Sequence, residues 1–177
     1  MVNTRQLVHL SLLLAMATSL HLLEGLFPIP LPLPGVKLGL ANIVTLLVLY
    51  LYDLRAGLTV SLLRVFLGSL IGGLFLSPAF FLGLSGVVVS TLVMALLLKY
   101  TKCFSPLGIS LAGAVAHNLG QLFMASQILQ STAIFYYLPF LLLAAIPTGL
   151  TTGYILKRLL ERLEQTAILP ELTGRRS

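Results

Sequence analysis

Long apolar runs dominate this chain, and most of them approach the ~20 residues that an α-helix needs to cross a bilayer. Apolar residues make up 58% of its 177 residues and charged residues only 9%, whereas about a quarter of a soluble domain is charged. A soluble globular core is therefore excluded. Membrane β-strands are about half as long as these runs and alternate in polarity, so the sequence predicts an all-α integral membrane protein.

The apolar runs and the charges between them predict six transmembrane helices. We expect these helices at Leu7–Leu26, Val36–Tyr52, Ala56–Phe75, Ala79–Leu98, Leu107–Leu129 and Ile134–Leu156. Proline and polar residues separate them, notably the prolines between Pro28 and Pro34. Residues 1–160 are therefore expected to form a six-transmembrane-helix bundle, and residues 161–177 a cytoplasmic tail.

The basic residues fall almost entirely on one side of this helix order. That side carries Arg5, Arg55, Lys99, Lys102, Lys157, Arg158, Arg162, Arg175 and Arg176. The other side carries only Lys37, and Arg64 lies within a span. Because cytoplasmic loops of membrane proteins are enriched in Lys and Arg, the bias predicts a multi-pass protein of the cell membrane with both termini in the cytoplasm.

The acidic residues are too few for most enzyme chemistry. The chain has five, of which only Asp53 is an aspartate, so it lacks the carboxylates that two-metal or Asp-rich diphosphate sites require. The single cysteine, Cys103, and the histidines lack zinc-site spacing. The chain has no phosphate-binding ATPase loop, so any use of ATP would need another subunit. We expect no catalysis, metal or cofactor, and no nucleic-acid partner, since the basic residues flank apolar segments.

Seven polar residues from three of the expected helices are predicted to lie at one depth in the membrane. Counting 1.5 Å per residue from the cytoplasmic side places them in the outer third. They are His21, Glu24, Lys37, Asn42, His117, Asn118 and Gln121. Any one of them could simply bond a neighbouring helix, but their agreement in depth predicts a ligand pocket.

Arg64 is deeper, about 13 Å into a hydrocarbon core of ~30 Å. It is too deep to reach the interface easily, so we expect it to face the bundle interior. Two interpretations remain open: an internal packing group, with the hydroxyls of Thr148, Thr151 and Thr152 as acceptors, or the anion-binding floor of the pocket. With Lys37 and Arg64 facing it, the pocket would be cationic and would suit a carboxylate or phosphate group.

Two further features bear on ligand access and on packing. The alternating prolines from Pro28 to Gly39 favour a stiff, extended loop, which could be a lid over the pocket or only a spacer. Small residues four apart, as in Gly149 and Gly153, let helices approach closely and are expected mostly to serve internal packing. The pair Ser11 and Ala15 could instead face a partner protein.

Two segments carry a family resemblance: Pro34-Gly-Val-Lys-Leu-Gly-Leu-Ala-Asn42 and His117-Asn118-Leu-Gly-Gln121. Together with six short spans and internal termini, they resemble the Gx transporter family, also called heptaprenyl diphosphate synthase component I, over roughly residues 5–160. That family is similar to the S components of energy-coupling factor (ECF) transporters. These are small six-helix substrate-binding proteins of the bacterial inner membrane that capture vitamins or cofactor precursors from outside.

The resemblance implies a role for each of these segments. The Pro28–Gly39 loop would be the lid, and the residues of the outer-third cluster would hold the ligand. Ser11, Ala15 and Ala17 would meet an ECF coupling subunit that is driven by two ATPases. Ser11 stands where the S-component pattern usually has alanine.

The expected function is therefore that of a membrane-embedded, substrate-binding transporter subunit. Its substrate would be a small cofactor, vitamin, or quinone or isoprenoid precursor. The alternative is a non-catalytic membrane subunit that associates with a prenyl-quinone synthesis enzyme or an electron-transfer complex. If Arg64 and His117 point into one cavity, the binding interpretation is favoured.

Overall fold

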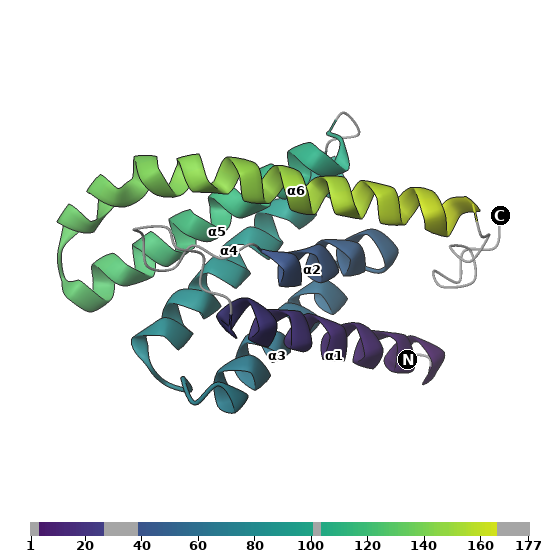
Figure 1. Cartoon of the computed structure of the whole chain (residues 1–177), viewed down its shortest axis with the longest axis horizontal. Helices are drawn as coiled ribbons and strands as arrows, with labels where there is room; N and C mark the ends of the chain where they lie inside the picture. The colour runs from purple at the N-terminus through teal and green to yellow at the C-terminus, as the bar shows by residue number, and fades with distance from the viewer. Residues whose placement is uncertain (1–3, 27–38, 101–103, 166–177) are drawn as a thin grey trace.

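The structure, a computed structural model, describes residues 4–26, 39–100 and 104–165 (Figure 1). Within these ranges the chain forms helices and no strand. They are α1 (Thr4–Leu26), α2 (Leu40–Leu51), α3 (Leu54–Ile71), α4 (Pro78–Tyr100), α5 (Pro106–Leu129), the short 3₁₀ helix η1 (Thr132–Tyr137) and α6 (Leu138–Gln165). Five helical segments are long and apolar enough to cross a membrane, and α2 is shorter. The predicted all-helical, multi-pass membrane fold is confirmed.

The third helix ends earlier than its apolar run suggested. We expected it to reach Phe75, but α3 ends at Ile71. Gly72 caps it through its backbone N–H, and Gly73 follows with a φ of 69°. Glycine adopts this left-handed conformation without steric cost, so the chain turns here although the next residues are still apolar.

The last helix is displaced towards the C-terminus relative to the expected span. It begins at Leu138, after η1, and continues to Gln165, beyond Leu156, where the expected membrane span ends. The extension is amphipathic: Leu160 and Leu163 pack against the hydrophobic core, while the charged residues among them stay at the surface. The expected start of the second helix, Val36, lies outside the described residues.

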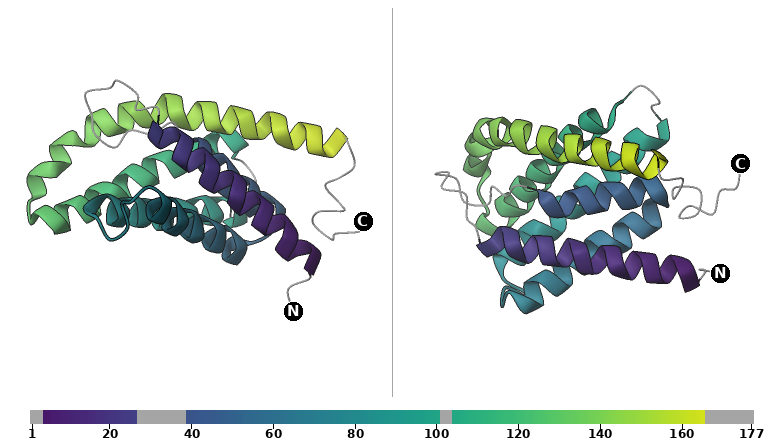
Figure 2. Two further views of the ribbon diagram at one scale, coloured as in Figure 1. Left: turned by 60° about the horizontal axis from the view of Figure 1, so that its bottom comes forward. Right: turned by 45° about the vertical axis from the view of Figure 1, so that its right-hand side comes forward.

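Helix α2 lies at the centre of the bundle. It contacts α1, α3, α4 and α6, and Figure 1 and the right-hand view of Figure 2 show it between α6 and α1. Eight of its residues are buried, including Val44, Leu46 and Val48. The longer helices follow one another around it, with α3 against α4, α4 against α5 and α5 against α6. Because α2 has only 12 residues, it fills the middle of the bundle over part of the length of its neighbours.

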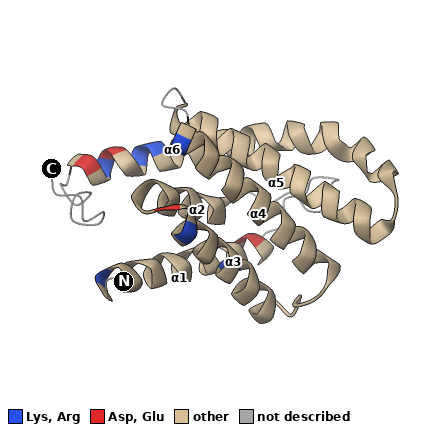
Figure 3. Ribbon diagram, turned by 180° about the vertical axis from the view of Figure 1, so that it is seen from behind, with Lys and Arg blue, Asp and Glu red and all other residues tan. Residues whose placement is uncertain are grey.

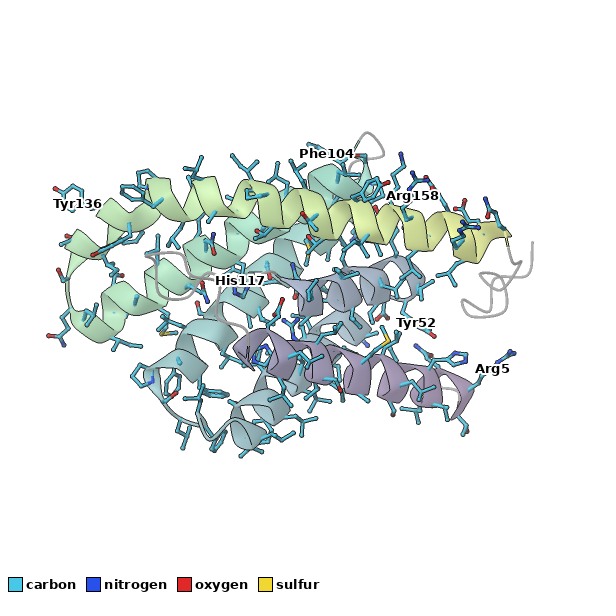
Figure 4. All side chains as sticks on the ribbon, viewed as in Figure 1. Arg5, Tyr52, Phe104, His117, Tyr136 and Arg158 are labelled. Atoms are coloured by element: carbon cyan, nitrogen blue, oxygen red, sulfur yellow. The ribbon has the colours of Figure 1, made fainter. Side chains whose placement is uncertain are left out.

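The charged and aromatic residues mark the two ends of the bundle. Lys and Arg gather at the end where α1 begins and α6 finishes (Figure 3). Arg5 and Arg158 lie at this end, and Tyr136 lies at the opposite end (Figure 4). Large apolar side chains such as Leu12 and Leu143 are more than 60% exposed between these ends. This pattern is typical of a lipid-facing surface between two interfaces.

Small residues let the helices pack closely, as their spacing predicted. A Cβ atom added at Gly153 of α6 would lie 2.7 Å from Cα of Leu107 on α5. One added at Gly149 would lie 2.8 Å from Cα of Leu111. Because these obstacles are backbone atoms, α5 and α6 can be this close only with glycine at both positions.

Gly153→Ala is therefore expected to force α5 and α6 apart and to lower the free energy of unfolding by about 1–3 kcal/mol, as overpacking does. The matched control is Gly25→Ala, since a Cβ at Gly25 has no atom within 4 Å. That control should lose no stability, because alanine is the better helix former. Thermal unfolding of both variants in detergent measures the difference. Equal midpoints would contradict the packing described for Gly153.

Candidate functional site

A cavity lies at the start of α2, and all six α-helices line it. Its volume is about 100 Å³. The lining residues are His21, Glu24, Gly39, Ala41, Asn42, Arg64, Val65, Gly83, Val87, Ala114, His117, Asn118, Gln121, Ala144, Ala145, Thr148 and Thr152. The polar members face one another across small and aliphatic residues, the usual composition of a small-molecule pocket.

Seven of the eight residues predicted to bind the ligand line this one cavity. They are His21 and Glu24 from α1, Asn42 from α2, Arg64 from α3, and His117, Asn118 and Gln121 from α5. The eighth, Lys37, lies outside the described residues, as does the predicted lid up to Gly39. The outer-third cluster and the deeper Arg64 thus share one cavity. Their roles in binding remain predictions.

The imidazole ring of each histidine in the cavity packs directly against a glycine of a neighbouring helix. A Cβ atom added at Gly86 of α4 would lie 2.8 Å from Cε1 of His117. One added at Gly68 of α3 would lie 2.5 Å from Cδ2 of His21. These two glycines therefore set where the imidazole rings sit. The spacing of residues in the sequence could not identify them, because the pairing depends on how α4 and α3 are rotated towards α5 and α1.

Glu24 connects three helices at the edge of the cavity. Its carboxylate Oε1 accepts a hydrogen bond from the backbone N–H of Leu40, the first residue of α2. An acidic side chain at this position also complements the positive end of the helix dipole. The same carboxylate interacts electrostatically with Arg64 on α3. Glu24 therefore joins α1 to both α2 and α3.

Arg64 is buried in the bundle interior, with 4% of its surface exposed. Its Nε atom makes no hydrogen bond to any residue within the ranges that the structure describes. Arg64 and His117 line the same cavity from α3 and α5, and His117 is seen in the middle of the bundle in Figure 4. The site thus combines one buried cation with amide and imidazole groups.

A comparison with known protein families identifies the family of this chain. A family model described as heptaprenyl diphosphate synthase component I matches residues 13–159. The chain belongs to this family. The match includes every residue that lines the cavity. No curated protein and no solved structure matches the chain.

Two of the three threonines expected near Arg64 line the cavity, and the third does not. Thr148 and Thr152 line the cavity, whereas Thr151 is exposed and donates to the carbonyl of Pro147. The hydroxyl of Thr148 donates to carbonyls of its own helix. The hydroxyl of Thr152 also donates to carbonyls of α6, and it lies 2.6 Å from the hydroxyl of Ser110 on α5. Part of the cavity lining is therefore hydroxyl-bearing, and these hydroxyls are held in place by hydrogen bonds within α6 and to α5.

Asn118 lines the cavity and also forms a hydrogen bond between α5 and α6. Its Nδ2 donates a 2.8 Å hydrogen bond to the carbonyl oxygen of Leu141 on α6. Hydrogen bonds between membrane helices contribute roughly 0.6–1.7 kcal/mol. Asn118 therefore has a structural role besides its predicted role in ligand binding.

The three residues predicted to contact a coupling subunit do not share one face of α1. Ser11 and Ala15 are exposed, but Ala17 has no exposed surface and packs with Val44 and Val60. Successive residues of a helix are 100° apart, so Ala17 lies about 200° around α1 from Ala15. The exposed part of this predicted surface is thus Ser11 and Ala15, while Ala17 belongs to the core.

Proposed function

We propose that this protein is the membrane-embedded, substrate-binding subunit of an uptake transporter, similar to an ECF S component. It would take up a small cofactor, vitamin, or quinone or isoprenoid precursor from the outer face. Energy for uptake would come from a separate coupling subunit and its ATPases. The exposed Ser11 and Ala15 on α1 are the proposed contact with that subunit.

The cavity is the observation that carries this proposal. Polar and ionisable residues are costly inside a membrane and are retained where they bind or conduct something. Here seven such residues from four helices converge on one cavity, although they are distant in sequence. A scaffold protein would have no need to turn its intramembrane polar groups towards a shared internal space.

The orientation of the protein is part of the proposal. The start of α1 and the end of α6 lie at the same end of the bundle, where Lys and Arg gather (Figure 3). The positive-inside rule assigns this end to the cytoplasm of the cell membrane. The cavity at the start of α2 then lies towards the outside, as a protein that captures external solutes requires.

The family description supports a second candidate function. It names a component of a synthase, so the protein could be a non-catalytic membrane subunit of a prenyl-quinone synthesis enzyme or an electron-transfer complex. In that case the exposed surface of the helices would matter rather than the cavity. Stable co-purification of such an enzyme from native membranes, with no effect of cavity substitutions, would favour this alternative.

A ligand panel tests the transporter proposal. The detergent-purified protein is heated with each of a set of vitamins, aromatic quinone precursors and isoprenoid precursors. A ligand at about 100 times its Kd should stabilise the folded state by about 2.7 kcal/mol, which raises the unfolding midpoint. No shift of the midpoint with any compound of the panel would refute the proposal.

Gly86→Ala tests whether the position of the His117 ring, which packs against Gly86, matters for ligand binding. The added methyl group would displace the imidazole ring, and a misplaced polar group in a binding site costs on the order of 1–3 kcal/mol. We expect roughly 10-fold weaker binding of any compound that the panel identifies. Gly25→Ala, whose added methyl group meets no neighbour, serves as the control. Unchanged affinity in Gly86→Ala would show that the position of His117 is irrelevant to the ligand.

A further inference from the structure

Arg64 has donor capacity that the described protein does not use. Its guanidinium carries five N–H groups in a planar fork, and Nε has no hydrogen-bond partner among the described residues. The side chain is 4% exposed, so bulk water does not readily replace the missing acceptor. Buried polar groups in proteins are almost always hydrogen-bonded. An unpartnered atom of this kind, on a residue that lines a cavity, points to an acceptor on the ligand.

The electrostatic balance of the cavity limits the charge of that acceptor. Arg64 is the sole Lys or Arg among the described residues that line it. The start of α2 adds the partial positive charge of a helix N-terminus, and Glu24 offsets part of the total. The charges of the described residues therefore favour a singly charged group, because the several charges of a diphosphate exceed what these residues neutralise.

We infer that the cavity binds an acidic small molecule through a single carboxylate, which the guanidinium of Arg64 holds beside the start of α2. This inference rests on the proposed function and names the chemical class of its substrate. Two N–H groups of a guanidinium match the two oxygens of a carboxylate. Asn42, His117 and Gln121 then face the uncharged remainder of the ligand.

The test compares acids with their uncharged esters on the unmodified protein. Biotin, nicotinate and 4-hydroxybenzoate are each measured by thermal shift beside their methyl esters, as is every other acid that binds in the full panel. Isopentenyl diphosphate is the multiply charged probe. Loss of a charge-assisted hydrogen bond corresponds to roughly 10- to 100-fold weaker binding. We expect an acid to bind, its ester to bind at least about 10-fold more weakly, and the diphosphate not to bind.

Arg64→Lys supplies a second measurement. Lysine keeps the positive charge but lacks the planar fork, so the acid should lose roughly 10-fold in affinity while any residual ester binding stays unchanged. Arg158→Lys, an exposed arginine on α6, is the matched control. If Arg64→Lys does not fold, the ester comparison on the unmodified protein decides.

The outcomes separate this inference from the proposed function. Binding of a neutral compound alone, of an ester as tightly as its acid, or of the diphosphate in preference to the acids would overturn the inference and leave the proposed function standing. A failure of every compound in the panel to bind would overturn the proposed function, and the inference with it.

Discussion

Replacing Glu24 by alanine is expected to lower the free energy of unfolding by about 3 kcal/mol. A hydrogen bond to a charged group contributes about 1.5–3 kcal/mol, and the upper end applies because the Glu24 carboxylate also stabilises the buried charge of Arg64. The loss has two parts: the guanidinium of Arg64 loses a negative charge that acts on it, and the backbone N–H of Leu40 loses its acceptor. Unfolding in detergent, followed by circular dichroism, measures the change.

A double substitution separates these two parts. Replacing two buried charges that interact by neutral groups of similar size is often nearly neutral for stability, because neither charge is left uncompensated. Glu24→Gln with Arg64→Met should therefore recover much of the stability that Glu24→Ala loses, since glutamine still offers an oxygen to Leu40. The control is Glu164→Ala, an exposed glutamate near the end of α6, which should change stability by no more than about 0.5 kcal/mol. A Glu24→Ala protein as stable as Glu164→Ala would contradict the assigned link between α1, α2 and α3.

Joint replacement of His117 and Asn118 by alanine is expected to reduce uptake of the substrate to the level of cells without the protein. Both side chains line the cavity from α5. Each is expected to contribute about 1–3 kcal/mol when its polar group bonds the ligand, and together they correspond to a loss of roughly 30-fold or more in affinity. Uptake of the labelled panel compound that stabilises the purified protein is the measurement.

The controls for this experiment use the same residue types outside the cavity. His9 on α1 lies 3.3 Å from the hydroxyl of Tyr52, and Gln127 is an exposed amide near the end of α5. His9→Ala with Gln127→Ala should leave uptake at the level of the unmodified protein. Because Asn118→Ala also removes the hydrogen bond to Leu141, protein levels in the membrane must be compared. Full uptake by a normally expressed cavity variant would exclude these residues from binding.

The sequence predicted the helices and the convergence of the polar residues, because both depend on local rules. Apolar length and flanking charge define a transmembrane helix, and helical rise gives the depth of each residue. Glu24, Asn42 and Gln121 were placed at one level in this way, and the structure brings them to one cavity. Depth sufficed here because a narrow bundle leaves few internal positions at a given level.

The features that sequence could not supply depend on rotation and on backbone conformation. Which acidic residue comes near Arg64 depends on how α1 is turned against α3, so the electrostatic interaction of Glu24 with Arg64 could not be predicted. Gly86 beneath His117 was missed for the same reason. Helix length was overestimated for α3, since apolar residues continue past Gly73 although the chain turns there. Ala17 was grouped with Ser11 and Ala15 on the basis of the family resemblance, whereas helix geometry places it on the buried side.

Native mass spectrometry of the detergent-purified protein tests the central claim most directly. We predict that the protein purified from its own membranes carries a bound small molecule, seen as a defined mass increment. The increment should persist in the variant with His9→Ala and Gln127→Ala and disappear with His117→Ala and Asn118→Ala. The bare mass of the chain in every preparation, with a prenyl-quinone enzyme stably attached instead, would contradict a substrate-binding role and favour a scaffold subunit.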